Sequence, residues 1–395
     1  MDTLSVLSSC VSAMAPLSII TATGALMTYY KAFDKSTNDM IANSCYKFFF
    51  PLFISLNLIA ATNSDKLSDE WPLLVIPILA ILISSIVSFI HIPLCKPPHE
   101  IRFTMHYVLV FASSGSIPLL LTQGMCKYGP LKGDDTCDNA ASYVYIQLIP
   151  FAVITWTYGF VLVYTDHLEK RKLLKVMKNS EEKHKESEEE EALESENLGR
   201  NNVEILIPPN YTDTPKREDE KPKTLKYILM SQLIRPVPVS CYLGLALGCI
   251  PGIHDIFTNS DAILNPLYNG GYLVGYSGVI LSQMILGSNL LLSRKNKKLV
   301  SKFYIFSIVA LRCILITSIG LLIIWGLWTA DIFLGDKTMA YVSFMNFATP
   351  STVIASVLCQ ILDVGIEDTS VVLFWMYAFS FFSLTISSYI LFLVI

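Results

Sequence analysis

FASSGSIPLLLTQG, at residues 111–124, and FMNFATPSTVIAS, at residues 344–356, are the two stretches that decide how this chain folds. Each is apolar overall, yet each has a proline, Pro118 or Pro350, beside small hydroxylated residues in its middle. A proline removes one helical hydrogen bond and blocks another, so we expect a break in each helix. A break at membrane depth is tolerated only where protein or a water-filled cavity compensates the freed backbone groups.

The composition around these stretches is that of a membrane protein. Of the 395 residues, 52% are hydrophobic and 16% are charged, whereas soluble domains carry roughly a quarter charged residues. Residues 166–225 hold 28 of the 62 charged side chains, so the rest of the chain is poorer still. This distribution excludes a soluble enzyme, a nucleic-acid-binding protein and a disordered protein.

Charge-poor stretches of the length that crosses a bilayer, about 20 residues, recur ten times. They lie at residues 5–30, 41–62, 71–95, 103–125, 140–165, 225–250, 262–292, 303–329, 338–361 and 370–394. Because five spans precede the charged segment and five follow it, the second half must insert upside down. We therefore predict an all-α polytopic membrane protein of two inverted five-helix repeats, residues 1–165 and 225–395, with broken fourth and ninth helices. Residues 166–224 are predicted to be a disordered charged linker.

The basic residues orient the spans. Loops on one side carry Lys31, Lys35, Lys96, Arg102, Lys170, Arg171, Lys172, Arg294, Lys295, Lys297 and Lys298. The other side has only Lys66, Lys127, Lys132 and Lys337. By the positive-inside rule the first side is cytosolic, so the linker is cytosolic and both termini face the outside or a lumen. Cys126 and Cys137 flank a polar loop on that outer side and can form a disulfide if the compartment is oxidising.

The pairing of the two breaks indicates a substrate site. Taken singly, a proline in a membrane helix is more simply a kink without function, but breaks in matching spans of two halves point to a substrate. The predicted substrate-binding residues are Ser113, Ser114, Gly115, Ser116, Pro118, Asn346, Thr349, Pro350 and Ser351. Catalytic residues, metal ligands and cofactors are not expected, because HExxH, GxSxG, paired intramembrane aspartates and Cys/His metal spacings do not occur.

Other polar residues in the spans are weaker signals. Arg312 lies inside the eighth span, where a charge is costly, so it either has a partner in the protein or reaches to the interface. We expect hydrogen bonds between helices from Asn57, Gln123, Gln283, Asn289 and Gln360. The sequence places no Asp or Glu deep within a span, which argues against a proton relay and an acidic cation site. Transport should then respond to membrane potential more than to a sodium or proton gradient.

Four stretches resemble the auxin efflux carrier family, and its PIN-LIKES branch more than its PIN-FORMED branch. KFFFPLFISLNLIA from Lys47 is similar to K-x-x-F-x-x-x-P-A-L-x-x-x-x-L-A, and SSGSIPL to G-N-x-G-N-x-P-L. ILGSNLL, at residues 285–291, is similar to L-I-L-G-x-N-L-L. ATPSTVIASVLCQILDVGIEDTSVVLFWMYAFSFFSLTISS from Ala348 resembles T-P-P-A-x-x-I…Q-L-F-x-V-G-x-x-E-x-S-V-I-L-L-W-x-Y-A-x-A-x-x-S-L-T. The resemblance covers all ten spans and skips the linker.

This resemblance implies a fold and a function. A scaffold of helices 1, 2, 6 and 7 would hold a transport domain of helices 3–5 and 8–10 that moves like an elevator, with the substrate beside the crossing of helices 4 and 9. The implied substrate is a small organic anion such as an auxin, and the implied location is the endoplasmic reticulum membrane rather than the plasma membrane. The implied partners are this substrate and membrane lipids, without nucleic acid, and a homodimer is left open.

One departure from the PIN-LIKES pattern bears on the substrate. Ser113 and Ser116 stand where the branch has two asparagines. Serine keeps a donor and an acceptor but is shorter and lacks the amide. The resemblance therefore implies the crossing of the two broken helices more directly than it implies recognition of an indole carboxylate. The alternative function is a membrane sensor or scaffold that binds a small ligand and signals through its linker without transport.

Overall fold

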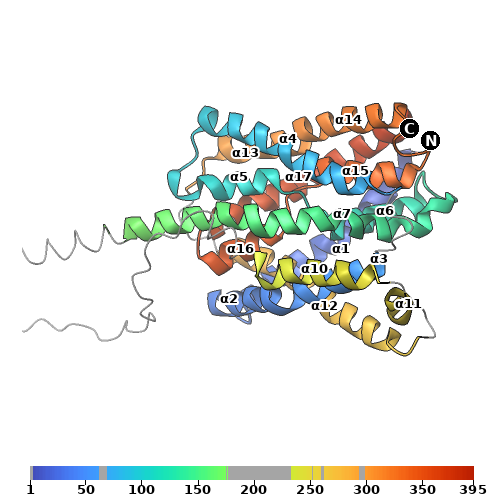
Figure 1. Cartoon of the computed structure of the whole chain (residues 1–395). Coiled ribbons are helices and arrows are strands. Elements are labelled where there is room, and N and C mark those ends of the chain that lie inside the picture. The colour runs from blue at the N-terminus through green and yellow to red at the C-terminus, as the bar shows by residue number, and fades with distance from the viewer. Residues whose placement is uncertain are drawn as a thin grey trace, which may run out of the picture.

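The computed structural model describes residues 3–61, 69–174, 176, 233–250, 252–258, 262–292 and 299–395. Within these ranges the regular structure is helical, with one isolated antiparallel bridge between Ala112 and Ser351. Most of the long helices run roughly along one common direction, and the first helix begins at the end of the bundle where the last one finishes (Figure 1).

In chain order, the helices of the described residues have the following bounds. They are α1 (Thr3–Tyr29), α2 (Lys35–Ser44), η1 (Cys45–Phe49), α3 (Phe50–Ala61), α4 (Pro72–Cys95), η2 (His99–Ile101), α5 (Arg102–Val110), α6 (Ser116–Tyr128), η3 (Asp135–Asn139), α7 (Ala140–Ile154), η4 (Thr155–Gly159), α10 (Pro236–Gly248), α11 (Ile253–Thr258), α12 (Asn265–Leu292), α13 (Lys302–Ala310), η6 (Leu311–Ile316), α14 (Thr317–Thr329), α15 (Lys337–Ala348), α16 (Ile354–Leu362) and α17 (Ile366–Val394). The segments η1, η4 and η6 are π-helical turns inside longer helices.

Seven helices among the described residues are long and apolar enough to cross a membrane. They are Val6–Tyr29, Lys35–Ala61, Pro72–Cys95, Asp135–Leu174, Asn265–Leu292, Lys302–Thr329 and Ile366–Val394, and they coincide with seven of the predicted spans. The predicted spans 103–125 and 338–361 are each two shorter helices, α5 with α6 and α15 with α16, joined by an extended stretch. For the predicted span 225–250 the structure describes residues 233–250, which contain the shorter apolar helix α10.

The predicted linker begins later than expected. The helix that follows η4 continues through Leu174, so residues 166–174 are helical. Asp166, the expected first linker residue, is fully buried and accepts hydrogen bonds from Thr104 N at 2.6 Å and Phe103 N at 3.2 Å. These bonds satisfy two amides in the first turn of α5, which have no acceptor within that helix. Extension of the helix after η4 places the Asp166 carboxylate beside these amides. Except for residue 176, the remainder of 166–224 lies outside the described residues.

Close backbone contacts join α1, the α2–η1–α3 helix, α10 and α12 into what we call the glycine-packed group. A Cβ atom on Gly24 of α1 would lie 2.0 Å from the carbonyl oxygen of Met284 on α12, and one on Gly287 1.8 Å from that of Thr21. Similar tight contacts with the α2–η1–α3 helix involve Gly244, Gly275 and Gly278. Small residues let membrane helices approach this closely, so these helices pack as one body.

Helices α4–α7 and α13–α17 form what we call the crossing group. They pack around α15, which contacts α4, α7 and α14, and every residue of α15 from Thr338 to Ala348 is buried. A polar helix face with Ser343 and Asn346 is thus enclosed at the centre of this group. The α15–α16 break therefore lies inside protein rather than against lipid.

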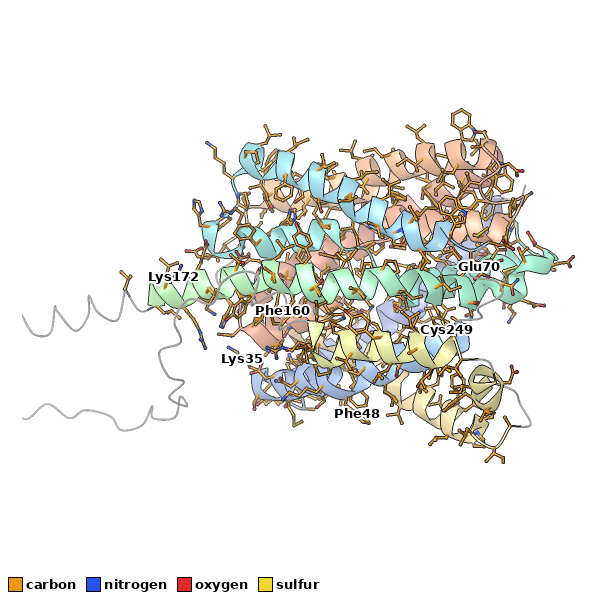
Figure 2. All side chains as sticks on the ribbon, in the orientation of Figure 1. Lys35, Phe48, Glu70, Phe160, Lys172 and Cys249 are labelled. Atoms are coloured by element: carbon orange, nitrogen blue, oxygen red, sulfur yellow. A yellow bond between two sulfur atoms is a disulfide. The ribbon has the colours of Figure 1, made fainter. Side chains whose placement is uncertain are left out.

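The two ends of the bundle differ in charge. Lys35 and Lys172 lie at the same end, which we call the basic end, and Glu70 lies near the opposite end (Figure 2). At that opposite end Cys126 of α6 and Cys137 of η3 form a disulfide, which resolves the alternative that the sequence left open.

The polar residues predicted to join helices do so in part. Asn289 Nδ2 on α12 donates to Gln360 Oε1 on α16 at 3.0 Å, and Thr21 on α1 donates to Gln283 on α12 at 3.3 Å. The prediction is wrong for Asn57, which donates to Phe53 O in its own helix, and for Gln123, which is exposed. A polar side chain can bond to the backbone carbonyl four residues before it in the same helix. Sequence spacing does not distinguish this local bond from a bond between two helices.

Candidate functional site

The two helix breaks meet in the middle of the crossing group. Ser113 N donates to Pro350 O at 2.8 Å, and Thr352 N donates to Phe111 O at 3.1 Å. The stretches between α5 and α6 and between α15 and α16 therefore cross as an antiparallel pair centred on the Ala112–Ser351 bridge. Backbone groups that no longer bond within a helix bond to the other break instead.

The prolines act on the carbonyl four residues before them. In an α-helix the amide of residue i bonds to the carbonyl of residue i−4, and proline has no such amide. Pro118 therefore leaves the carbonyl of Ser114 without a helical donor, and Gln147 Nε2 donates to it at 3.3 Å. Pro350 does the same to the carbonyl of Asn346, which accepts instead from the guanidinium of Arg312.

Arg312, in the π-helical turn η6, supplies donors to both breaks. Its Nη2 donates to Asn346 O and its Nε to Thr349 O, both at 3.0 Å. Its Nη1 donates to Leu109 O and to Ser84 Oγ, both at 3.4 Å. The side chain is fully buried. Of the two alternatives for this residue, the partner inside the protein is confirmed and the reach to the interface is wrong.

The side chains of Asn346 and Gln147 link the two helix breaks through hydrogen bonds. Asn346 Nδ2 donates to Gln147 Oε1 at 2.8 Å and to Ser343 O at 3.1 Å. The Gln147 amide thus bonds to one break with its nitrogen and to the other with its oxygen. Thr349 Oγ1 adds a direct bond to Ser113 O at 2.9 Å. The crossing is held by a continuous buried hydrogen-bond network.

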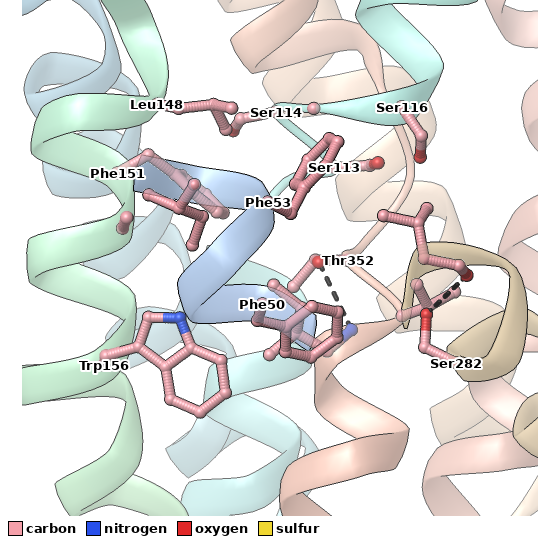
Figure 3. A pocket seen from close by; sticks show the side chains of 16 residues that line it. Phe50, Phe53, Ser113, Ser114, Ser116, Leu148, Phe151, Trp156, Ser282 and Thr352 are labelled. Carbon is pink, nitrogen blue, oxygen red and sulfur yellow. Dashed lines mark hydrogen bonds between the residues drawn. The ribbon is translucent and has the colours of Figure 1, made fainter. Parts of the chain in front are cut away.

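A cavity of about 70 Å³ lies beside the crossing, between the crossing group and the glycine-packed group. One wall is formed by the two breaks and the first residues of α6 and α16: Ser113, Ser114, Gly115, Ser116, Thr352, Val353 and Ile354. The facing wall is largely aromatic and apolar, with Phe50, Phe53 and Ile54 from α3 and Leu148, Phe151, Ala152 and Trp156 from α7 and η4. Figure 3 shows these side chains together with Ser282 of α12.

Two helix N-termini open onto the polar wall. Gly115 is the N-cap of α6 and Val353 is the N-cap of α16, and neither makes a capping bond with its own side chain. In α16 the first amide, Ile354 N, donates to Thr352 Oγ1 at 3.3 Å, and the next two amides donate to Thr352 O and Val353 O. The first amides of a helix lack helical acceptors and carry its partial positive charge, so they attract anions. Ser114 Oγ, on the same wall, is buried and has no hydrogen-bond partner among the described residues. The polar wall therefore offers the partial positive charge of two helix N-termini, together with the donor of the Ser114 hydroxyl.

The predicted site residues divide into two sets. Ser113, Ser114, Gly115 and Ser116 line the cavity. Pro118, Asn346, Thr349, Pro350 and Ser351 do not line it but build the crossing behind it. Gln147 and the aromatic wall were not predicted. The position of Pro118, four residues after Ser114, shows that the carbonyl of Ser114 needs another donor. The sequence near Ser114 does not show which residue donates, because Gln147 lies on another helix.

The cavity is small in this conformation. A buried water occupies about 10–15 Å³ on this measure, so the space suits a few waters rather than an organic acid. A larger ligand requires the aromatic wall to move relative to the crossing. Because that wall belongs partly to α3, such a movement separates the two helix groups.

A second, more open cavity of about 340 Å³ lies at the basic end. There Asp363, between α16 and α17, pairs with Lys35 of α2 at 2.9 Å and with Lys170 at 3.0 Å. Partial burial acts to raise the pKa of Asp363, but the two lysines hold that pKa below its usual value. The Lys35–Asp363 pair bridges the two helix groups, and at this exposure it contributes little to stability.

Comparison with known proteins gives a family match and several relatives. Residues 9–388 match the sequence profile of the family described as membrane transport protein. The chain is 23% identical to Protein PIN-LIKES 3 of Arabidopsis thaliana over 383 residues, which cover 93% of each chain. It is 20% identical to Protein PIN-LIKES 1 over 382 residues, 94% of this chain and 76% of the relative, and 22% identical to Protein PIN-LIKES 4 over 372 residues, 87% of each, both from the same plant.

Proposed function

This chain belongs to the family of membrane transport proteins, and from that premise we propose that it is a carrier, not an enzyme, for a small organic anion. The observation that carries the proposal is the cavity at the crossing, where two helix N-termini face an aromatic wall. A carboxylate is stabilised by the partial positive charge of helix N-termini and accepts hydrogen bonds from the serine hydroxyls beside them. An aromatic body of the same ligand packs against Phe50 and Trp156.

The substrate class that fits both walls is an auxin-like indole carboxylate. Trp156 is almost fully buried and lies 5.1 Å from Tyr46 and 6.1 Å from Phe50, measured between ring centroids. Aromatic rings favour tilted and offset contacts with one another, so this cluster is suited to a planar ring. The serine hydroxyls of Ser113, Ser114 and Ser116 supply donors and acceptors for the acid group in place of asparagine amides.

We place ten transmembrane crossings in the chain, as two inverted repeats at residues 1–165 and 225–395, with the linker 166–224 between them. The seven unbroken helices account for seven crossings, α5–α6 and α15–α16 for two, and α10 with the residues before it for one. The basic end then faces the cytosol. Membership of the PIN-LIKES branch favours the endoplasmic reticulum membrane.

The proposed transport movement is elevator-like. The glycine-packed group serves as the scaffold, and the crossing group carries the substrate past it. Backbone approaches within the scaffold are tight, whereas contacts between the groups include the exposed Lys35–Asp363 pair and the bond from Ser9 Oγ to Gly124 O at 3.0 Å. The bond from Asn289 to Gln360 at 3.0 Å also joins the two groups, so these side-chain bonds must break or exchange partners when one group slides on the other.

Uptake of labelled indole-3-acetate into vesicles that contain the purified protein tests the carrier proposal. Protein-dependent accumulation that unlabelled indole-3-acetate inhibits is the expected result. Saturable binding without accumulation would contradict it and support the sensor alternative.

Trp156→Leu tests the aromatic wall. We expect its KM for indole-3-acetate to rise about tenfold, as loss of an aromatic contact worth about 1 kcal/mol and of ring burial implies. Inhibition by hexanoate, which has no ring, should change much less. Trp328→Leu, at the far end of α14, is the matched control and should leave both values unchanged. Equal losses for both anions would show that Trp156 has no role in ring recognition.

A further inference from the structure

We propose that the guanidinium of Arg312 is a built-in cation that occupies a carbonyl-lined position at the crossing, so that transport requires no sodium ion. This inference rests on the proposed carrier function and specifies its ion coupling. It follows from the oxygen atoms around the guanidinium, from its burial and from the charges near it.

The oxygen atoms around Arg312 are of the kind that bind alkali cations. Three are backbone carbonyls, Leu109 O, Asn346 O and Thr349 O, and the fourth is Ser84 Oγ, at 3.0 to 3.4 Å from the guanidinium nitrogens. In carriers with broken helices, unwound carbonyls of this type coordinate the coupled cation. Here the guanidinium donates to these carbonyls and takes the place that such an ion would occupy.

The carbonyls come from both halves of the chain. Leu109 lies in the last turn of α5, Asn346 lies in the last turn of α15, and Thr349 is the C-cap of α15. One planar guanidinium can serve them together because its donors form a fixed fork. A sodium ion would join the two breaks only while it is bound. The guanidinium of Arg312 joins them permanently, because it is covalently part of the chain.

No carboxylate of the described residues pairs with the charge of Arg312. Among the lysines and arginines that the structure describes, Arg312 is the one that is fully buried, and all four of its described acceptors are neutral. A buried charge without a counterion is unfavourable. A substrate carboxylate in the neighbouring cavity, which the break residue Ser113 lines, is expected to compensate that charge and to be attracted by it.

The first measurement needs no variant. We expect the wild-type protein to take up indole-3-acetate at the same rate in sodium chloride, potassium chloride and choline chloride, and its melting temperature in detergent to be equal in the three salts. Sodium-dependent uptake, or a melting temperature raised by sodium alone, would overturn the inference. Because the melting measurement does not depend on flux, it decides the inference even if indole-3-acetate is not carried.

The second measurement replaces the built-in cation by a free one. Arg312→Ala should melt at a lower temperature and lose at least about tenfold in uptake, because carbonyls that bonded a charged group lose their donor. Millimolar guanidinium chloride, which does not stabilise folded proteins in general, should raise the melting temperature of Arg312→Ala and restore part of its uptake. Full uptake without any added guanidinium would overturn the inference, as would a folded variant that guanidinium leaves unchanged.

Arg102→Ala is the matched control. Arg102 begins α5 at the basic end and stacks on the ring of Phe103, 4.6 Å from its centroid, outside the crossing. Guanidinium should not raise the melting temperature of this variant. Arg312→Lys separates charge from shape: it keeps the charge but loses the fork, so we expect sodium-independent uptake at a reduced rate.

Discussion

At the scale of single residues, the crossing depends on two carbonyls that lack a helical donor. Pro118 and Pro350 withhold the amides that would bond to Ser114 O and Asn346 O. The chain supplies side-chain donors for both, from Gln147 and Arg312. An unsatisfied carbonyl in a lipid-surrounded core costs several kcal/mol, so these donors are required for stability as well as for the shape of the site.

The Asn346–Gln147 pair allows this requirement to be measured. Asn346→Ala and Gln147→Ala should each lower the free energy of unfolding by about 1–3 kcal/mol, because each leaves buried polar atoms without partners. The double variant should lose less than the sum of the two, because the shared hydrogen bond of 2.8 Å is removed by either change. Thermal or denaturant unfolding in detergent measures all three.

Gln123→Ala is the control for that cycle, since Gln123 is exposed on α6. It should change stability little. Strictly additive losses for the Asn346 and Gln147 variants would show that the two side chains act independently.

The sequence predicts the residue positions of the breaks better than their partners. Ser113, Ser114 and Ser116 line the cavity as expected, since small hydroxylated residues next to a proline mark the break itself. Gln147 and Trp156 come from another helix, and neither has a neighbour in sequence that would distinguish it from an ordinary core residue. Their roles depend on the packing of α7 against the crossing, which periodicity does not specify.

At the scale of helices, breaks and π-turns position the chemistry. A π-helical turn inserts one extra residue into an α-helix and is often found at functional sites. Of the turns η1, η4 and η6, the last carries Arg312 and η4 carries Trp156. Each thus re-aims one long side chain toward the crossing region. Apolar runs without charge predicted the long helices, but nothing in the composition of LRCILI or TWTYG distinguishes a π-turn from an α-helix.

Proline substitutions test whether the breaks are needed. Pro350→Ala provides an amide that competes with Arg312 for the carbonyl of Asn346, so we expect a folded protein whose uptake is strongly reduced. Pro118→Ala should act in the same direction but more weakly, because Pro118 already lies in the first turn of α6, where few amides have helical partners. Uptake and melting temperature measured on the same preparations separate a lost site from a lost fold.

Pro93→Ala is the control for these variants. Pro93 is an exposed proline inside α4, away from the crossing, and its replacement should leave uptake nearly normal. Normal uptake in both crossing variants would mean that the prolines are kinks without function.

At the scale of the whole molecule, the charge on the moving part determines how voltage acts. In the proposed elevator, Arg312 travels with the crossing group. The empty carrier then moves one positive charge within the bilayer, and the loaded carrier moves none, because the substrate carboxylate offsets the guanidinium. A potential of 100 mV acts on one elementary charge with about 2.3 kcal/mol. Voltage should therefore govern the return of the empty carrier rather than the crossing of the loaded one.

Exchange and net uptake separate these two steps. In vesicles with unlabelled indole-3-acetate inside, labelled substrate enters by exchange and the carrier never returns empty. We expect exchange to be insensitive to a potential set with potassium and valinomycin, whereas net uptake into empty vesicles should accelerate when the inside is positive. Vesicles without valinomycin serve as the control for ion-gradient effects. Equal voltage sensitivity of the two modes would place the moving charge on the substrate alone, and Arg312 would then belong to a part of the protein that stays still.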